Sequence, residues 1–117
     1  MIRRVSAVLT SLAFVGLVAI GTTNNLMAGG AGDAAKGKEV YEGNMCATCH
    51  NITGDEGGVG PTLKGVFKRK TLKNGKPVND ANVMAQINEG GGGMPPYGGS
   101  LSADDKANML AFLHSLQ

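Results

Sequence analysis

Tryptophan is absent from this chain of 117 residues, and cysteine occurs only twice. Aromatic side chains are also scarce: beyond residue 28 they are Tyr41, Phe67, Tyr97 and Phe112. A domain this short builds only a marginal hydrophobic core, and small domains often depend on a disulfide, a metal or another staple. The sequence therefore predicts that something besides side chains fills the interior.

The chain has little excess of charge of either sign, with a formal net charge of +2. Without Arg3 and Arg4 the basic and acidic residues are equal in number, which removes the main support for nucleic-acid binding. Charge is nevertheless uneven. A run without acidic residues contains Lys64, Lys68, Arg69, Lys70, Lys73 and Lys76. This basic run is either a solvated surface or a surface that attracts an acidic partner.

The N-terminal segment has the layout of an export signal. Arg3 and Arg4 precede an apolar stretch over residues 5–20, and small residues follow around Ala28. We expect residues 1–28 to be removed, which leaves residues 29–117 as one domain in the periplasm without stable membrane insertion. The alternative is a retained segment that anchors the protein to the membrane, although the apolar stretch is short for a span of about 20 residues.

Both cysteines lie in the sequence Cys46-Ala47-Thr48-Cys49-His50, and three interpretations compete. The first is a disulfide or a thioredoxin-like redox pair; such a redox pair should follow a strand, but the preceding residues have a helical pattern. A zinc site needs four ligands, and no second pair of Cys or His residues is available. C-x-x-C-H is the attachment signature of c-type haem, with Cys46 and Cys49 as thioethers and His50 as the proximal iron ligand. The motif favours haem.

An electron-carrying haem usually has a second axial ligand, Met or His. Met45 adjoins the attachment site, Met84 and Met109 have the spacing of core residues, and His114 lies on an amphipathic C-terminal helix as an expected surface side chain. Met94 differs, because it stands between four glycines and Pro95-Pro96. Glycines let a chain approach a ligand closely, and prolines stiffen the exit. We predict Met94 as the second iron ligand.

The remaining pattern predicts a mostly helical domain. Asp33 is a candidate cap for a helix to about residue 44, and residues 62–69 have the pattern of a short helix. Asn79 or Asp80 begins another helix, and Ser102 with Asp105 makes a capping box for the last one. Asn-Gly at 74–75 predicts a hairpin turn, which Pro77 restricts to a short ribbon.

With these motifs in place, residues 31–116 resemble a small bacterial class I cytochrome c with one haem. The resemblance covers C-A-T-C-H at 46–50, G-P-x-L-x-G at 60–65 and G-M-P-P-Y at 93–97. It implies an all-α fold around one covalent haem and its iron, with a hairpin insertion. It also implies close packing of the first and last helices at Gly37, Tyr41 and Phe112. The carbonyl of Pro61 would accept a hydrogen bond from His50 Nδ1.

The expected function is single-electron transfer between redox protein partners, without enzymatic activity. Two protein ligands on the iron would leave no position for a substrate. An alternative is a dedicated haem subunit of a periplasmic dehydrogenase or oxidase complex. A third hypothesis, a catalytic or gas-binding haem, requires that Met94 is not bound to the iron.

Overall fold

The computed structural model describes residues 32–117, so the predicted export signal lies outside the described residues. These residues form α1 (Ala34–Gly43), η1 (Cys46–Thr48), η2 (Val66–Lys68), α2 (Asp80–Glu89) and α3 (Ala103–Ser115). No sheet is present among residues 32–117, which confirms the predicted all-α class. Within the same range, no helix is long and apolar enough to cross a membrane.

Local capping fixes where the helices begin, as the sequence predicted. The Asp33 carboxylate accepts hydrogen bonds from the backbone N–H groups of Ala35 and Lys36 at 2.8 and 3.1 Å. Ser102 and Asp105 exchange both bonds of a capping box at the start of α3. Asn79 rather than Asp80 caps α2, with a bond from Asn82 N at 2.8 Å. These caps satisfy N–H groups that the helix itself cannot pair.

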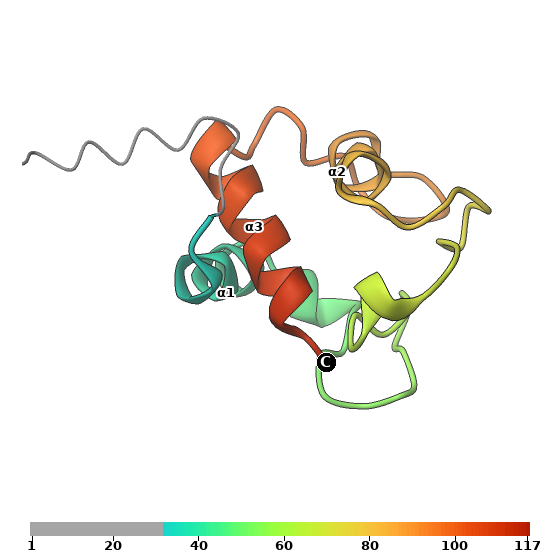
Figure 1. The fold of residues 1–117 in the computed structure, drawn as a ribbon. Coiled ribbons are helices and arrows are strands. Elements are labelled where there is room, and N and C mark those ends of the chain that lie inside the picture. The colour runs from blue at the N-terminus through green and yellow to red at the C-terminus, as the bar shows by residue number, and fades with distance from the viewer. Residues whose placement is uncertain (1–31) are drawn as a thin grey trace, which may run out of the picture.

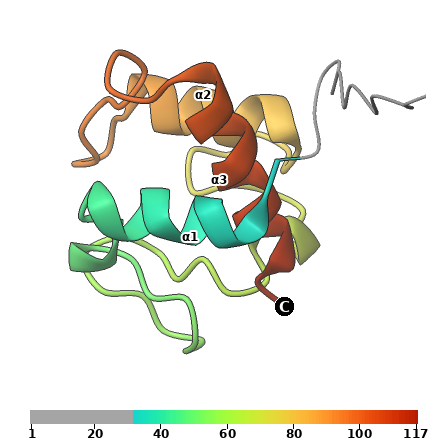
Figure 2. The ribbon, with the colours of Figure 1, turned by 90° about the vertical axis from the view of Figure 1, so that its left-hand side faces the viewer.

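The helices α1 and α3 cross in close contact and form the core of the domain (Figures 1 and 2). A Cβ atom on Gly37 would lie 2.0 Å from the carbonyl oxygen of Asn108, so only glycine permits this approach. The rings of Tyr41 and Phe112 pack 5.5 Å apart beside the crossing. Met109 and Leu113 of α3 are buried in the same core, which agrees with the expected core position of Met109 and with an amphipathic C-terminal helix.

The segment from residue 62 to the start of α2 is less regular than the sequence indicated. The helix expected over residues 62–69 is only the short turn η2, because Gly65 adopts a left-handed φ of 59° directly before it. The Asn-Gly turn is present, with Gly75 at a φ of 82°. The predicted ribbon is a single antiparallel bridge between Thr71 and Pro77, since a proline lacks the N–H that a longer ladder needs.

His114 has a structural role that its expected surface position did not include. Its ring stacks on Phe67 with a centroid distance of 3.6 Å, and its Nε2 lies 2.6 Å from Asp80 Oδ1. Because Phe67 belongs to η2 and Asp80 begins α2, one half-exposed side chain on α3 joins three elements. His114 does not line the cavity described below.

Candidate functional site

A cavity of about 870 Å³ lies between the helices and loops, and all five site residues expected from the sequence line it: Cys46, Cys49, His50, Pro61 and Met94. Most of the remaining wall is apolar and includes Leu63, Val83 and Leu113. The wall combines residues from α1 through α3. Segments that are far apart in the sequence therefore converge on one space.

The two cysteines reach the cavity through a tight turn after α1. Met45 adopts the left-handed conformation, with φ 57°, and ends the preceding helix. The turn η1 then places His50 N 2.9 Å from the carbonyl oxygen of Cys46. The two sulfurs form no disulfide. Burial raises the pKa of the Cys46 thiol, which is opposite to the lowered pKa of a reactive redox cysteine.

His50 is held by contacts on three sides. Its Nδ1 lies 2.7 Å from the carbonyl oxygen of Pro61, as the resemblance implied. A carbonyl only accepts, so Nδ1 carries the hydrogen and the lone pair of Nε2 remains available for a metal. The Tyr41 hydroxyl donates to the His50 carbonyl oxygen at 2.6 Å. A Cβ on Gly60 would lie 2.6 Å from Cε1 of the imidazole, so the missing side chain makes room for the ring.

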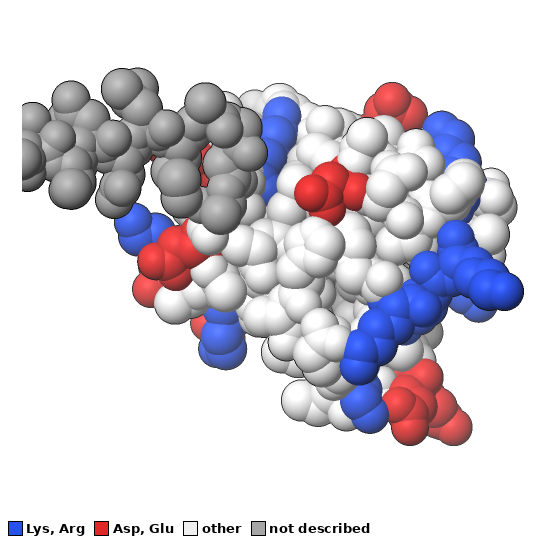
Figure 3. All heavy atoms as spheres, in the orientation of Figure 1, with Lys and Arg blue, Asp and Glu red and all other residues white. Residues whose placement is uncertain are grey.

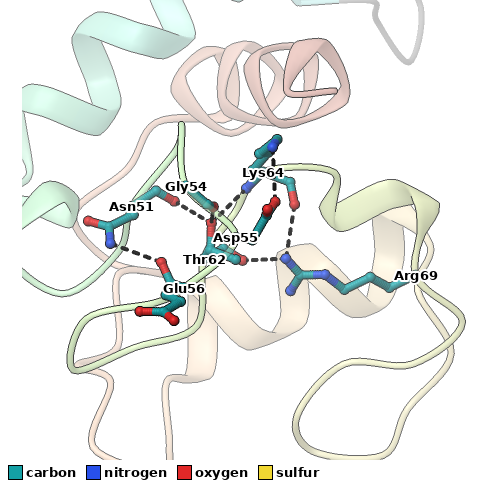
Figure 4. A network of polar contacts seen from close by, with 7 residues as sticks. All are labelled: Asn51, Gly54, Asp55, Glu56, Thr62, Lys64 and Arg69. Carbon is teal, nitrogen blue, oxygen red and sulfur yellow. Dashed lines mark hydrogen bonds and ion pairs between the residues drawn. The ribbon is translucent and has the colours of Figure 1, made fainter.

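A network of polar contacts fixes the loop that carries Pro61 (Figure 4). The Thr62 hydroxyl donates to the carbonyl oxygen of Gly54 at 2.6 Å, and Leu63 N donates to Asn51 O at 2.7 Å. Directly after η2, one nitrogen of the Arg69 guanidinium donates to the carbonyl oxygens of Thr62 and Lys64 at 2.6 and 2.9 Å. Arg69 therefore stabilises this loop, although the sequence placed it in the basic run with the lysines.

The same loop carries one exposed ion pair. Lys64 Nζ lies 2.9 Å from Asp55 Oδ1. This hydrogen bond, together with the positive charge of Lys64, lowers the pKa of the Asp55 carboxyl. Lys64 is thus partly neutralised within the molecule.

Met94 lies in a loop whose shape depends on the preceding glycines. Gly90 to Gly93 all have positive φ, and Gly91 and Met94 exchange two backbone hydrogen bonds of 2.9 and 3.1 Å. Gln86 Nε2 lies 3.9 Å from Met94 Sδ. Met109 also lines the cavity but is buried in the core on α3, whereas Met84 does not line it.

The charges around the cavity suit a cofactor that carries carboxylates. Arg69, Lys73 and Lys76 are on the wall, against one carboxylate from Glu89. Together with two thiols, a free imidazole nitrogen and an apolar wall, this chemistry fits haem, a flat apolar ring with two acid groups.

Sequence reasoning missed Gly60 and the Tyr41 hydroxyl at this site. The glycine belongs to a quoted motif, but the sequence shows no sign of the tyrosine bond.

Comparison with known proteins agrees with this geometry. The family described as "Cytochrome C oxidase, cbb3-type, subunit III" matches residues 32–113. Cytochrome c6 of Leptolyngbya boryana is 40% identical over 79 residues, which are 68% of this chain and 86% of that protein. The chain belongs to the class I cytochrome c family. Cytochrome c6 of Synechocystis is 38% identical over 71% of this chain, and the match spans 65% of that relative.

The fold of this cytochrome c is also similar to a solved structure. Cytochrome c6 of the diatom Phaeodactylum tricornutum superposes with a TM-score of 0.53 at 29% identity, over 70% of this chain and 91% of that one. The cytochrome therefore carries one covalent haem c with its iron, and it is a small electron carrier.

Proposed function

We propose that this cytochrome is a periplasmic single-electron carrier with His50 and Met94 as the axial ligands of its iron. Cys46 and Cys49 would hold the porphyrin covalently, and the bound iron would supply the Fe(III)/Fe(II) couple. The convergence of these four residues and Pro61 on one cavity is the observation that carries the proposal. Cleavage after Ala28 would release residues 29–117 as the working protein.

The protein's own residues determine how the iron would behave. The bond between His50 Nδ1 and Pro61 O fixes the imidazole and increases the basicity of Nε2. Met94 on the other axial position would leave no site for a substrate, which favours electron transfer over catalysis. The apolar wall lowers the local dielectric constant, and a buried iron with a methionine ligand favours the reduced state.

A second candidate function is a haem subunit dedicated to one periplasmic oxidase or dehydrogenase complex. The description of the matching family, an oxidase subunit, supports it. Co-purification of the native protein decides between the two. A free carrier elutes alone and exchanges electrons with several partners, whereas a dedicated subunit remains with one catalytic chain.

The axial ligands are tested by replacing Met94 with alanine. Oxidised wild-type protein should show the weak sulfur-to-iron charge-transfer band at the red end of its spectrum. Met94→Ala should lose this band, lower the reduction potential and bind carbon monoxide when reduced. Met84→Leu, a methionine outside the cavity wall, is the matched control and should keep the band. Carbon monoxide binding to reduced wild-type protein would instead support an open, catalytic or gas-binding haem.

Attachment and export are tested together by the intact mass of the exported protein. One covalent haem and loss of residues 1–28 are expected. Haem that acid-acetone extracts from the denatured protein would overturn the attachment to Cys46 and Cys49. A mass that retains residues 1–28 would favour a membrane-anchored form.

A further inference from the structure

A chain of hydrogen bonds connects the hairpin tip to the sulfur of Met94. Lys76 N donates to Asn74 Oδ1 at 3.0 Å, and Asn74 Nδ2 donates to Gln86 Oε1 at 2.9 Å. Gln86 Nε2 then lies 3.0 Å from the carbonyl oxygen of Gly90 and 3.9 Å from Met94 Sδ. This series of hydrogen bonds runs from the turn at residues 74–75, through Gln86 of α2, to the loop that carries Met94.

The groups at the two ends of this hydrogen-bond series determine which partner is the donor in each bond. The backbone N–H of Lys76 can only donate, so the oxygen of the Asn74 amide must face it. The nitrogen of Asn74 therefore faces Gln86, and it can only donate, so Gln86 turns its oxygen toward Asn74. The nitrogen of Gln86 is left to face Gly90 and Met94. The carbonyl of Gly90, which can only accept, requires the same orientation.

We propose that Asn74 is a positioning residue for the iron site: it ensures that Gln86 presents an N–H, and not a carbonyl oxygen, to the Met94 sulfur. This inference rests on the proposed function, because it concerns the sulfur that would ligate the iron. Among residues 32–117, Asn74 forms no hydrogen bond with Met94 or Gly90, and its proposed effect passes through the amide of Gln86.

The orientation of that amide matters for the reduction potential. An N–H group directs the positive end of its dipole at the sulfur, which disfavours the additional positive charge of Fe(III) and so favours Fe(II). A carbonyl oxygen at the same place has the opposite effect. The reduction potential is therefore higher when the Gln86 amide directs its nitrogen at the sulfur than when it directs its oxygen there. The two orientations differ little in side-chain volume, and the same residues line the cavity in both.

Asn74→Asp tests the proposal with almost no change in shape. A carboxylate cannot donate, and it attracts the nitrogen of Gln86 by a charge-assisted bond that is stronger than the neutral bond to Gly90. The amide should rotate, and the potential should fall. Asn74→Leu removes the donor without adding charge, so the amide loses one of its two constraints and the fall should be smaller.

The Gln86→Leu background separates the amide from the added charge. In this background Asn74→Leu should leave the potential unchanged, and Asn74→Asp should show only the long-range effect of its charge. Asn82→Leu is the matched structural control, because Asn82 Nδ2 also ties the hairpin to α2, by a 2.8 Å bond to Pro77 O, and makes no hydrogen bond to the Gln86 side chain. It should lower the melting temperature without changing the potential.

Nuclear magnetic resonance of the reduced protein reports the orientation directly. The wild type should show a nuclear Overhauser effect between the side-chain amide protons of Gln86 and the Met94 methyl group, and Asn74→Asp should lose it. Equal potentials and equal Overhauser effects in wild type and Asn74→Asp would overturn the proposal. Absence of the sulfur-to-iron band in wild type would instead overturn the ligation by Met94, so the two failures are distinguishable.

Discussion

At the scale of single residues, Tyr41 illustrates how one side chain serves both the core and the site. Its ring packs on Phe112, and its hydroxyl reaches out of that core to the carbonyl oxygen of His50. Burial raises the pKa of the Tyr41 hydroxyl above its usual value of 10.0. The folded protein therefore favours the protonated form of Tyr41 over the ionised one.

Tyr41→Phe should cost about 1 kcal/mol of unfolding free energy at pH 7, through the lost hydrogen bond. The contribution of Tyr41 is complete below about pH 10 and declines as the pH rises above it, because only the unfolded chain ionises this hydroxyl readily. Urea unfolding at pH 7 and pH 11 measures the difference between wild type and variant. The difference should shrink at pH 11, and a constant difference would contradict this account. Tyr97→Phe, whose hydroxyl does not contact His50, is the control.

Gly60→Ala should disturb the site more than the removal of a single hydrogen bond does. The added Cβ would lie 2.6 Å from His50 Cε1 and 2.9 Å from Nδ1, so the imidazole must move away from Pro61 O. Overpacking of this kind costs about 1–3 kcal/mol. Thermal unfolding and the reduction potential should both fall. Gly54→Ala in the same loop meets nothing closer than 3.9 Å and should change neither.

At the scale of elements, the crossing of α1 and α3 depends on one glycine. Gly37→Ala would force its Cβ to within 2.0 Å of the Asn108 carbonyl oxygen and 2.6 Å of Phe112 Cβ, so the helices must separate. We expect a loss of at least about 2 kcal/mol of unfolding free energy, since backbone cannot yield as a side chain does.

Gly43→Ala in the same helix provides the comparison. Nothing lies within 4 Å of its added Cβ, and alanine has a higher helix propensity by about 1 kcal/mol. This variant should be as stable as wild type or more so. Urea unfolding of Gly37→Ala and Gly43→Ala gives two unfolding free energies, and their difference reports the close contact of α1 with α3. Equal destabilisation of both variants would show that the crossing tolerates a side chain.

The elements that the sequence predicted well are those with local signals. Asp33, Ser102 with Asp105, and the Asn-Gly turn each act on backbone groups within a few residues, so the caps and the turn were readable directly. The C-x-x-C-H motif is similarly local. The hairpin and the helix at 62–69 were overestimated, because the left-handed Gly65 and the bridge at Pro77 limit them.

Contacts between distant residues could not be predicted in this way. The bond from His114 to Asp80 spans 34 positions, and that from Asn74 to Gln86 spans 12. Arg69 gave the same signal as its lysine neighbours, yet it binds two carbonyl oxygens. Such roles arise from how the elements pack, which no short pattern in the sequence records.

At the scale of the whole molecule, the basic run forms a surface beside the haem cavity. Figure 3 shows Lys and Arg gathered on the side where Figure 1 places η2 and the hairpin. Lys73 and Lys76 line the cavity, while Lys64 pairs with Asp55 and Arg69 bonds backbone oxygens. The exposed Lys68 and Lys70 are therefore the charges to remove when steering of an acidic partner is tested.

Combining Lys68→Gln with Lys70→Gln should slow electron transfer to the physiological partner at low salt. Steering raises encounter rates, and salt screens it over about 10 Å at 0.1 M. The wild-type rate should fall as salt rises, and the variant should depend on salt less. The pair Lys36→Gln and Lys38→Gln on α1 removes the same charge elsewhere and should have a smaller effect. A rate independent of salt in wild type would leave the basic run as a solvated surface.

The two sides of the cavity are held with unequal firmness, and this sets the order in which the molecule opens. His50 has hydrogen bonds on its backbone N–H, its carbonyl and its ring, and the last two partners are themselves anchored. Met94 follows four glycines with positive φ, and an added Cβ on Gly91, Gly92 or Gly93 would touch nothing within 4 Å. Amide hydrogens of the methionine loop should therefore exchange through a sub-global opening of low free energy, while those of α1 and α3 exchange only when the whole domain unfolds. Under the proposed ligation, stress would release the Met94 sulfur before the His50 imidazole, and the first damaged form would be a folded haem protein that has lost one of its two protein ligands.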